Sequence, residues 1–431
     1  MHAGVTTTTT SPPQVLGRTV SSRQLESAFA DFLVFAIPAL EFVQIQVVGR
    51  LFATDVLVLA TLPFALLARG HRLAAPFPRK LILLGMLWLA SQMITDFVRQ
   101  TPFNDYARGW AKIAFFLASF GVLYVLAHNR PRRLVLYGIG LVVGGVLSFY
   151  LSPRPHAEVD PWKFGLGEPV TLLLILIATS RSVRRLPAEQ LLVLAFGALM
   201  NLYLGFRALS GVCFLAATYI ATRRLKARGH ELSLRNVALF TLISLGAGLG
   251  FLRAYEYAAD KGILGTSAQR KYETQAAGEL GVLIGARWEI LVSASAIKQS
   301  PILGYGSWAR NPQYAWLPLD LLRSFGYNVD EGDVSGADLI PTHSYLFSAW
   351  VEAGVLGGVF WLWILLVATR ALTVLRRTPD SRMPLIAFAG FMLIWNVLFS
   401  PFGAEQRFMT AYYIVLLLYV LENARSEQPR A

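Results

Sequence analysis

The chain has 431 residues, of which 55% are hydrophobic and only 15% are charged, and its mean hydropathy is +0.50. A water-soluble protein of this length has about 25% charged residues. The composition therefore excludes nucleic-acid-binding, fibrous and disordered proteins. It predicts a polytopic membrane protein, because apolar runs of roughly 17–25 residues recur along most of the chain. The single cysteine, Cys213, excludes an intrachain disulfide and a cysteine-based metal site.

The N-terminal segment is rich in Thr, Ser and Pro and has no apolar core, so it does not have the pattern of a signal peptide. We expect residues 1–27 to form a flexible cytoplasmic tail and residues 423–431 to form a second cytoplasmic tail.

Apolar runs predict twelve membrane-spanning helices. The expected spans are 28–48, 51–68, 81–96, 109–127, 134–151, 169–180, 187–204, 208–222, 236–253, 344–369, 384–400 and 408–422. Helices 1–9 then occupy residues 28–253 and helices 10–12 occupy residues 343–422. Between them, residues 254–342 form a large external loop domain.

Basic residues are distributed unequally between the two sets of connections. One set, with both termini, holds 23 of the 39 Lys and Arg residues, almost all in short loops. Short loops rich in Lys and Arg are cytoplasmic by the positive-inside rule. Both termini are therefore expected inside, and the net charge of +13 follows from membrane topology rather than from an acidic partner.

The long external segment contains its own helical signals. Residues 279–298 have the pattern of an amphipathic helix, and Pro301 ends it. Loops of this length are usually functional or disordered. The mixture of helix and turn signals favours a functional loop.

His343 is the leading candidate for chemistry, because only His343 and His156 are expected on the external side. Pro341 precedes it, and Thr342 or Ser344 can cap the following helix. A neutral imidazole can accept the proton of a hydroxyl near neutral pH. The alternative is an interfacial histidine whose polar tip lies among lipid headgroups. We expect His156, in a proline-flanked loop, to be an ordinary loop residue.

Arg207 lies in a turn between two short arms. Two crossings and this turn have to fit into 37 residues between basic loops, so each arm reaches only about 27 Å across a core of about 30 Å. The turn is therefore expected below the outer surface, where a guanidinium marks a substrate pathway or an ion pair. Its planar donors suit phosphate or pyrophosphate. The alternative is an ion pair with Glu41, Asp55 or Glu352.

Other charged residues have less specific signals. Arg287 lies beside Trp288 on the amphipathic helix, where a basic residue is more often a solvated or headgroup contact. The supporting candidates are Arg310, Arg108 and Glu352. The acidic run at 330–338 lacks the ligand spacing of a calcium loop, so we predict neither a metal site nor a cofactor. Without a nucleotide-binding or nucleophile motif, reactivity is expected to come from an activated lipid-linked substrate.

Two segments carry a resemblance. RWEILVSASAIKQSPILGYG (287–306) and HSYLFSAWVEAGVLG (343–357) resemble the signature of the bacterial O-antigen ligase and Wzy-type polysaccharide polymerase superfamily. FRALSG (206–211) is similar to the Ser-Arg-Gly-type periplasmic turn of this family, with Phe206 and Ala208 in place of serine and glycine. In size and layout the chain is also similar to polymerases of xanthan-type exopolysaccharide clusters.

The resemblance implies an all-α, GT-C-like glycosyltransferase of the bacterial inner membrane, metal-independent and inverting, with its active site facing the periplasm. The donor would be an undecaprenyl-pyrophosphate-linked glycan and the acceptor a second lipid-linked glycan. Arg207 and Arg287 would be pyrophosphate ligands, and His343 would activate the acceptor or contact phosphate. A chain-length regulator and a flippase come into consideration as partners, whereas nucleic acid does not.

Three functions remain open at this point. A polymerase would join lipid-linked repeat units into exopolysaccharide or O-antigen, and we favour it from the whole-chain likeness. An O-antigen ligase would transfer the glycan to lipid A–core with the same residues. A polysaccharide transporter or flippase is less favoured, because it would be expected to have broken helices or paired repeats and would not need a long external loop.

Overall fold

The computed structural model describes residues 22–153, 155–180, 187–227, 253, 257–258, 260–263, 289–314, 317, 338–377, 380 and 382–426. Within these residues the chain is almost entirely helical, and six helical segments are long and apolar enough to cross a membrane. These are Ala53–Ala74, Pro76–Arg99, Phe103–Ala127, Pro131–Leu151, Trp162–Thr179 and Val355–Leu375. The protein is therefore an all-helical membrane protein.

A helix lies at every expected span that the described residues cover. The helices are α1 (Ser22–Ala39), α2 (Ala53–Arg69), α3 (Pro76–Arg99), α4 (Phe103–Ala127), α5 (Pro131–Leu151), α6 (Gly167–Thr179), α8 (Pro187–Tyr203), α9 (Arg207–Ala227), α13 (Glu289–Gln299), α15 (Tyr345–Ala353), α16 (Val355–Leu375), α17 (Met383–Phe399) and α18 (Gln406–Ser426). Short helical turns are η1 (Leu40–Phe42), η2 (Gly70–Ala74), η3 (Pro155–Ala157) and η4 (Trp162–Leu166). The span expected at 236–253 lies outside the described residues, so the number of crossings stays a prediction.

The first span differs from the expectation, because α1 ends at Ala39 instead of continuing to residue 48. Two antiparallel strands follow, β1 (Gln44–Gln46) and β2 (Arg50–Phe52), with Gln46 opposite Arg50. Alternating Gln and branched apolar residues fit the two-residue period of a strand better than a helix. A membrane helix was expected here because the same residues also raise the local hydropathy.

The tenth span is two helices. α15 ends at Gly354, whose φ of +68° is unfavourable for residues with a side chain, and α16 begins at the next residue. A Cβ at Gly354 would lie only 1.9 Å from the carbonyl oxygen of Ile302. The break therefore lets the 302–304 turn pack directly against the joint between the helices.

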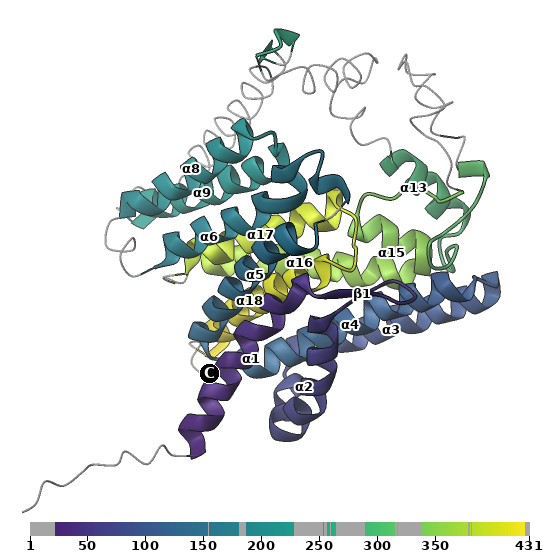
Figure 1. Ribbon diagram of the computed structural model, residues 1–431, viewed down its shortest axis with the longest axis horizontal. Helices are drawn as coiled ribbons and strands as arrows, with labels where there is room; N and C mark the ends of the chain where they lie inside the picture. The colour runs from purple at the N-terminus through teal and green to yellow at the C-terminus, as the bar shows by residue number, and fades with distance from the viewer. Residues whose placement is uncertain are drawn as a thin grey trace, which may run out of the picture.

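Close backbone contacts and aromatic packing hold the bundle together. α1 packs on α5, where a Cβ on Gly140 or Gly144 would come within 2.4 or 2.2 Å of backbone oxygens of α1. This is the small-residue approach common between membrane helices. α8 and α9 pack against each other at one edge of the bundle (Figure 1). The aromatic core is formed by Trp88, Phe116, Tyr345, Phe360, Trp361 and Phe402.

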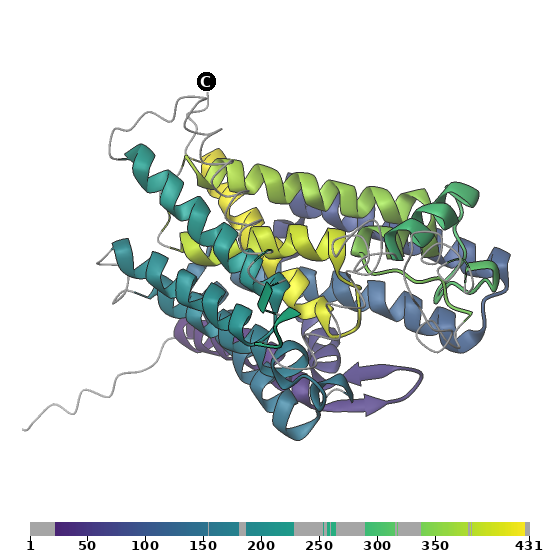
Figure 2. The same cartoon turned by 90° about the horizontal axis from the view of Figure 1, so that it is seen from above.

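The connections gather at two ends of the bundle. The cavity end comprises residues 40–52, 152–166, 204–206, 289–314, 338–344 and 400–405, and each of these segments contributes to the lining of one cavity. Figure 2 shows the purple hairpin and the green segments from 289 onward towards this end. The basic end includes Arg72, which donates to the oxygen of Val125, and Arg425, which lies over the ring of Phe77.

Candidate functional site

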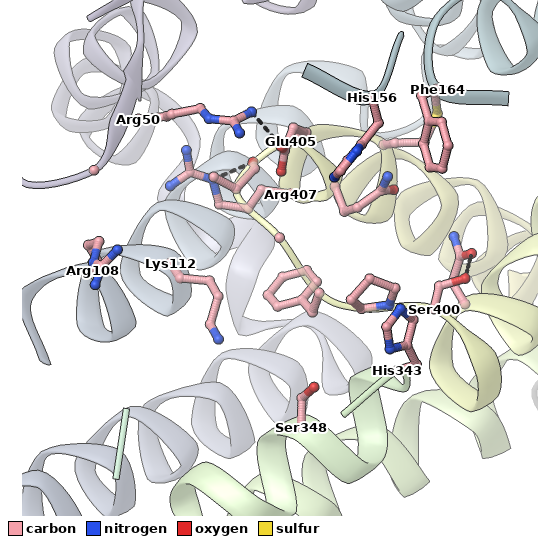
Figure 3. A pocket seen from close by; sticks show the side chains of 18 of the residues that line it. Arg50, Arg108, Lys112, His156, Phe164, His343, Ser348, Ser400, Glu405 and Arg407 are labelled. Carbon is pink, nitrogen blue, oxygen red and sulfur yellow. Dashed lines mark hydrogen bonds and ion pairs between the residues drawn. The ribbon is translucent and has the colours of Figure 1, made fainter. Parts of the chain in front are cut away.

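A cavity of about 1340 Å³ opens at the cavity end of the bundle. Its walls come from the β1–β2 hairpin, α4, η4 and the start of α6, α13, the 338–343 segment, α15, and the 399–407 connection between α17 and α18. Figure 3 shows Arg108 and Lys112 entering from α4, with His343 on the far side of the cavity. The residues that line the cavity are far apart in the sequence, so the cavity forms only when the bundle has assembled.

His343 is placed by the start of α15. Ser344 is the N-cap of this helix, since its hydroxyl accepts a hydrogen bond from the backbone N–H of Phe347 at 3.1 Å. The same hydroxyl donates to the carbonyl oxygen of Val397 on α17 at 2.7 Å. The side chain of His343 is 49% exposed and lines the cavity. The sequence prediction that Thr342 or Ser344 caps this helix is confirmed, with Ser344 as the cap.

A glycine-containing turn, 302–308, leads from α13 to residues 309–311, which pair with the start of the 338–343 segment. Gly304 and Gly306 have φ values of +81° and +90°, a conformation that favours glycine. Asp96, near the end of α3, accepts hydrogen bonds from the backbone N–H and the hydroxyl of Ser307, at 2.5 and 2.7 Å. The turn is therefore held by a buried carboxylate of a bundle helix, and it brings the next residues to the cavity wall.

Glu289, the first residue of α13, lies beside His343. Its Oε1 is 3.4 Å from Nδ1 of the imidazole, and its side chain is only 13% exposed. Its second oxygen, Oε2, is buried and accepts no hydrogen bond from the described residues. Ser293, one turn further along α13, donates to the carbonyl oxygen of Pro341 at 2.8 Å. The helix and the segment that bears His343 are thus joined at two points.

Two basic side chains of α4 form the wall opposite His343. Arg108 and Lys112 are four residues apart and so share one face of the helix. Lys112 Nζ lies 2.8 Å from Oε2 of Glu352 on α15. Arg108 pairs with Asp105, and its guanidinium lies over the ring of Trp308 at 4.4 Å. The wall therefore holds two cations in fixed positions on the cavity surface.

Two further arginines form ion pairs between elements at the cavity. Arg50 joins the hairpin to the connection before α18, and Arg407, in the first turn of α18, joins that helix to α2. Arg50 Nη1 lies 2.7 Å from Glu405 Oε1, and the side chain of Arg50 is 34% exposed at the cavity rim. Arg407 is different, because it is 2% exposed and pairs at 2.8 Å with Asp55, which is fully buried. Both arginines line the cavity, but the buried, paired guanidinium of Arg407 has a structural role, whereas Arg50 is accessible.

Arg207 begins α9, and its two neighbours Phe206 and Ala208 line the cavity. Arg207 is half-buried and does not itself belong to the described lining. The turn before it is anchored through Asn201, whose side chain accepts a hydrogen bond from Trp162 at 3.0 Å. Arg207 therefore lies at the margin of the cavity.

The remaining sequence candidates divide into three groups. Arg287 lies outside the described residues. Arg310 pairs with Asp105, at 3.4 Å, and its backbone forms a β-bridge with Leu339. It therefore stabilises the segment that leads to the cavity wall without lining the cavity itself. The candidates that the structure brings to one cavity are His343, Arg108 and Glu352.

Several charged wall residues were not among the sequence candidates, and Glu289, Lys112 and Arg50 are three of them. A lysine inside the apolar run 109–127 was a usable signal, because charged residues in spans are rare and often functional. Arg50 was hidden by its position between two predicted spans. Nothing in the sequence indicates that Glu289 and His343, 54 positions apart, become neighbours.

His156 also lines the cavity, with its ring 5.4 Å from that of Phe164, although we expected it to be an ordinary loop residue. Within the described ranges, no group of three or more His, Cys, Asp and Glu side chains is arranged to hold a metal ion. Asp330, Glu331 and Asp333 lie outside those ranges.

Comparison with known proteins adds no functional assignment. No family model matches the chain, and no curated protein matches it either. The function therefore has to be argued from the cavity and the side chains around it.

Proposed function

We propose that this protein is a polysaccharide polymerase, a membrane glycosyltransferase that joins undecaprenyl-pyrophosphate-linked repeat units into exopolysaccharide or O-antigen. The observation that carries the proposal is one cavity with His343 on one wall and Arg108 and Lys112 on the other. Its volume of about 1340 Å³ exceeds the roughly 300–1,000 Å³ of a site for one small ligand. That space suits a donor and an acceptor glycan together.

Each wall has a separate task in the proposed reaction. The acceptor hydroxyl loses its proton to His343 while its oxygen attacks C1 of the donor sugar. The bond between C1 and the phosphate oxygen breaks, and the electron pair leaves with the lipid diphosphate. Fixed cations stabilise that developing charge, and we assign this task to Arg108, Lys112 and Arg50. Attack opposite the leaving group inverts the configuration at C1, and the reaction needs no metal.

Arg207 and Arg287 remain proposed pyrophosphate ligands from the sequence resemblance. The position of Arg207 beside two lining residues supports a contact at the margin of the cavity. Arg207→Lys keeps the charge but removes the planar fork of donors, so we expect a strong loss of polymerisation rate. Wild-type activity of this variant would leave only a simple charge role.

The test is a deletion strain examined for lipid-linked products and complemented with the gene. Accumulation of single repeat units identifies a polymerase, whereas long chains left on the lipid carrier identify a ligase. The purified protein in proteoliposomes should also polymerise repeat units in excess EDTA. Loss of activity with EDTA, restored by a divalent ion, would contradict the metal-independent reaction. A strain with unchanged products would contradict both transferase functions, and the orientation of the cavity towards the periplasm is tested by labelling single cysteines on its rim.

A further inference from the structure

Glu289 and His343 come from segments that are fixed independently of their contact. The backbone N–H of Ile340 donates to the carbonyl oxygen of Ala309 at 2.9 Å, which holds the segment before His343. The hydroxyl of Ser293 holds the same segment against α13. Since both backbones are constrained, the fold places the two side chains next to each other, with Oε1 3.4 Å from Nδ1.

The two side chains differ in their access to the cavity. Glu289 is 13% exposed, whereas His343 is 49% exposed. A carboxylate beside Nδ1 favours the tautomer in which Nδ1 carries the proton, which leaves Nε2 as the proton acceptor. The carboxylate also stabilises the imidazolium that forms when Nε2 takes a proton. Burial keeps the carboxylate in place, and exposure lets the imidazole meet a substrate.

We infer that Glu289 is the positioning residue of His343: its carboxylate holds the Nδ1–H and thereby turns a basic Nε2 towards the acceptor hydroxyl. The catalytic consequence rests on the proposed function. In that reaction the proton of the acceptor hydroxyl passes to Nε2, the hydroxyl oxygen bonds to C1, and the diphosphate leaves with the electron pair. Glu289 forms no bond to either sugar and touches neither of them.

The basic end supplies a matched control. Glu422 Oε2 lies 3.5 Å from Nδ1 of His128, so the chain contains a second carboxylate–imidazole contact of nearly equal length away from the cavity. Glu289→Gln and Glu422→Gln each remove one negative charge with little change of shape. Only the first is expected to affect a reaction in the cavity.

The first measurement needs no substrate. The full-length protein, labelled with ¹⁵N-histidine and reconstituted in proteoliposomes, is examined by solid-state NMR, and the His343 signals are assigned from their loss in His343→Gln. We expect the wild type to have His343 protonated at Nδ1 near neutral pH. Glu289→Gln should lower the share of the Nδ1–H tautomer, because a neutral amide oxygen accepts less strongly than a carboxylate and the amide N–H can instead donate to Nδ1. A wild-type imidazole protonated at Nε2, or the same tautomer ratio in both proteins, would overturn the inference.

The second measurement is the rate of polymerisation of lipid-linked repeat units in the same proteoliposomes. We expect Glu289→Gln to lower kcat by about 10²-fold or more with little change in KM, because positioning acts on turnover. Glu422→Gln should retain the wild-type rate. A normal kcat in Glu289→Gln would overturn the positioning role. If the wild type shows the expected tautomer but polymerises nothing, the polymerase proposal fails while the contact between Glu289 and His343 stands.

Discussion

The two ends of the bundle contain similar pairs in different surroundings. At the cavity end, His343 meets Glu289 and is half exposed to a large cavity. At the basic end, His128 meets Glu422, but its ring packs on Tyr124 with centroids 5.2 Å apart and its side chain is 23% exposed. The two contacts differ by only 0.1 Å, from 3.4 to 3.5 Å. We therefore assign the proposed chemistry to the pair whose imidazole also reaches a space that can hold substrate.

Ion pairs show the same contrast. At the basic end, Arg133 is 4% exposed and binds Asp31 and the carbonyl oxygen of Leu126, so its donors are used within the protein. Lys112 and Glu352 are also largely buried, but both lie on the cavity wall. A buried pair adds little net stability compared with apolar residues of the same size. What distinguishes the Lys112–Glu352 pair is its place on the cavity wall, so we include it in the proposed site.

Removing the imidazoles gives the largest expected difference between the ends. His343→Ala should lower the polymerisation rate by about 10²-fold or more, because a general base is lost, and the protein should still insert in the membrane. His128→Ala should polymerise at nearly the wild-type rate. Initial rates in proteoliposomes with equal amounts of inserted protein measure both. Equal rates for the two variants would remove His343 from the mechanism.

Removing the charge of Lys112, one of the cations on the cavity wall, should have the next largest effect on the polymerisation rate. Lys112→Met is expected to slow polymerisation by about 10²-fold, because one fixed charge near the leaving diphosphate is lost. The single variant also leaves Glu352 unpaired, so the decisive protein is Lys112→Met/Glu352→Gln, which removes both charges. This double variant should unfold near the wild-type temperature, and its polymerisation rate should remain low.

The matched control is Arg382→Met/Asp380→Asn at the basic end, where the pair is 2.8 Å apart. It should retain polymerisation. Recovery of the wild-type rate in Lys112→Met/Glu352→Gln would show that the cavity pair only holds α4 against α15.

Substitution of two glycines should distinguish the close packing of the 302–304 turn near the cavity from helix packing elsewhere in the bundle. Gly354→Ala should lower the free energy of unfolding by about 2 kcal/mol or more, because φ is positive and the new Cβ would overlap Ile302. A Cβ at Gly211, within α9, meets no atom within 4 Å, so Gly211→Ala should be neutral or stabilising by up to about 1 kcal/mol. Thermal unfolding in detergent measures both changes. Equal stability of the two variants would contradict the packing described for the 302–304 turn.

The helices could be predicted because apolar runs of membrane length depend on local sequence alone. The hairpin was missed because Val43, Ile45 and Val47 are as apolar as the end of a helix, and the alternation with Gln44 and Gln46 is too short to outweigh that signal. His343 could be proposed from its own surroundings, with a proline before it and a cap after it. Its neighbour Glu289 could be identified only from the fold, because the contact depends on the pairing of residues 338–340 with 309–311 and on the hydrogen bond from Ser293 to Pro341.

The smallest expected difference between the two ends of the bundle is in the pH dependence of stability. Burial, followed by the charges of Arg72 and His71, lowers the pKa of His128 from its ordinary value of about 6.5. The unfolded chain then binds more protons at this site than the native protein. The contribution of His128 to stability is therefore fully present above the ordinary pKa of histidine, and it decreases as the pH falls from there towards the lowered pKa.

His128→Gln should remove this part of the pH dependence. We expect its unfolding temperature to change less than that of the wild type between pH 8 and pH 5.5, by on the order of 1 °C. Unfolding in detergent across this range, with the variant and wild type compared at each pH, isolates the contribution of one imidazole. Identical pH profiles would contradict a lowered pKa of His128 in the native protein. The expected profile would assign the imidazole of the basic end to stability, and a low polymerisation rate of His343→Ala would assign the imidazole of the cavity end to the reaction.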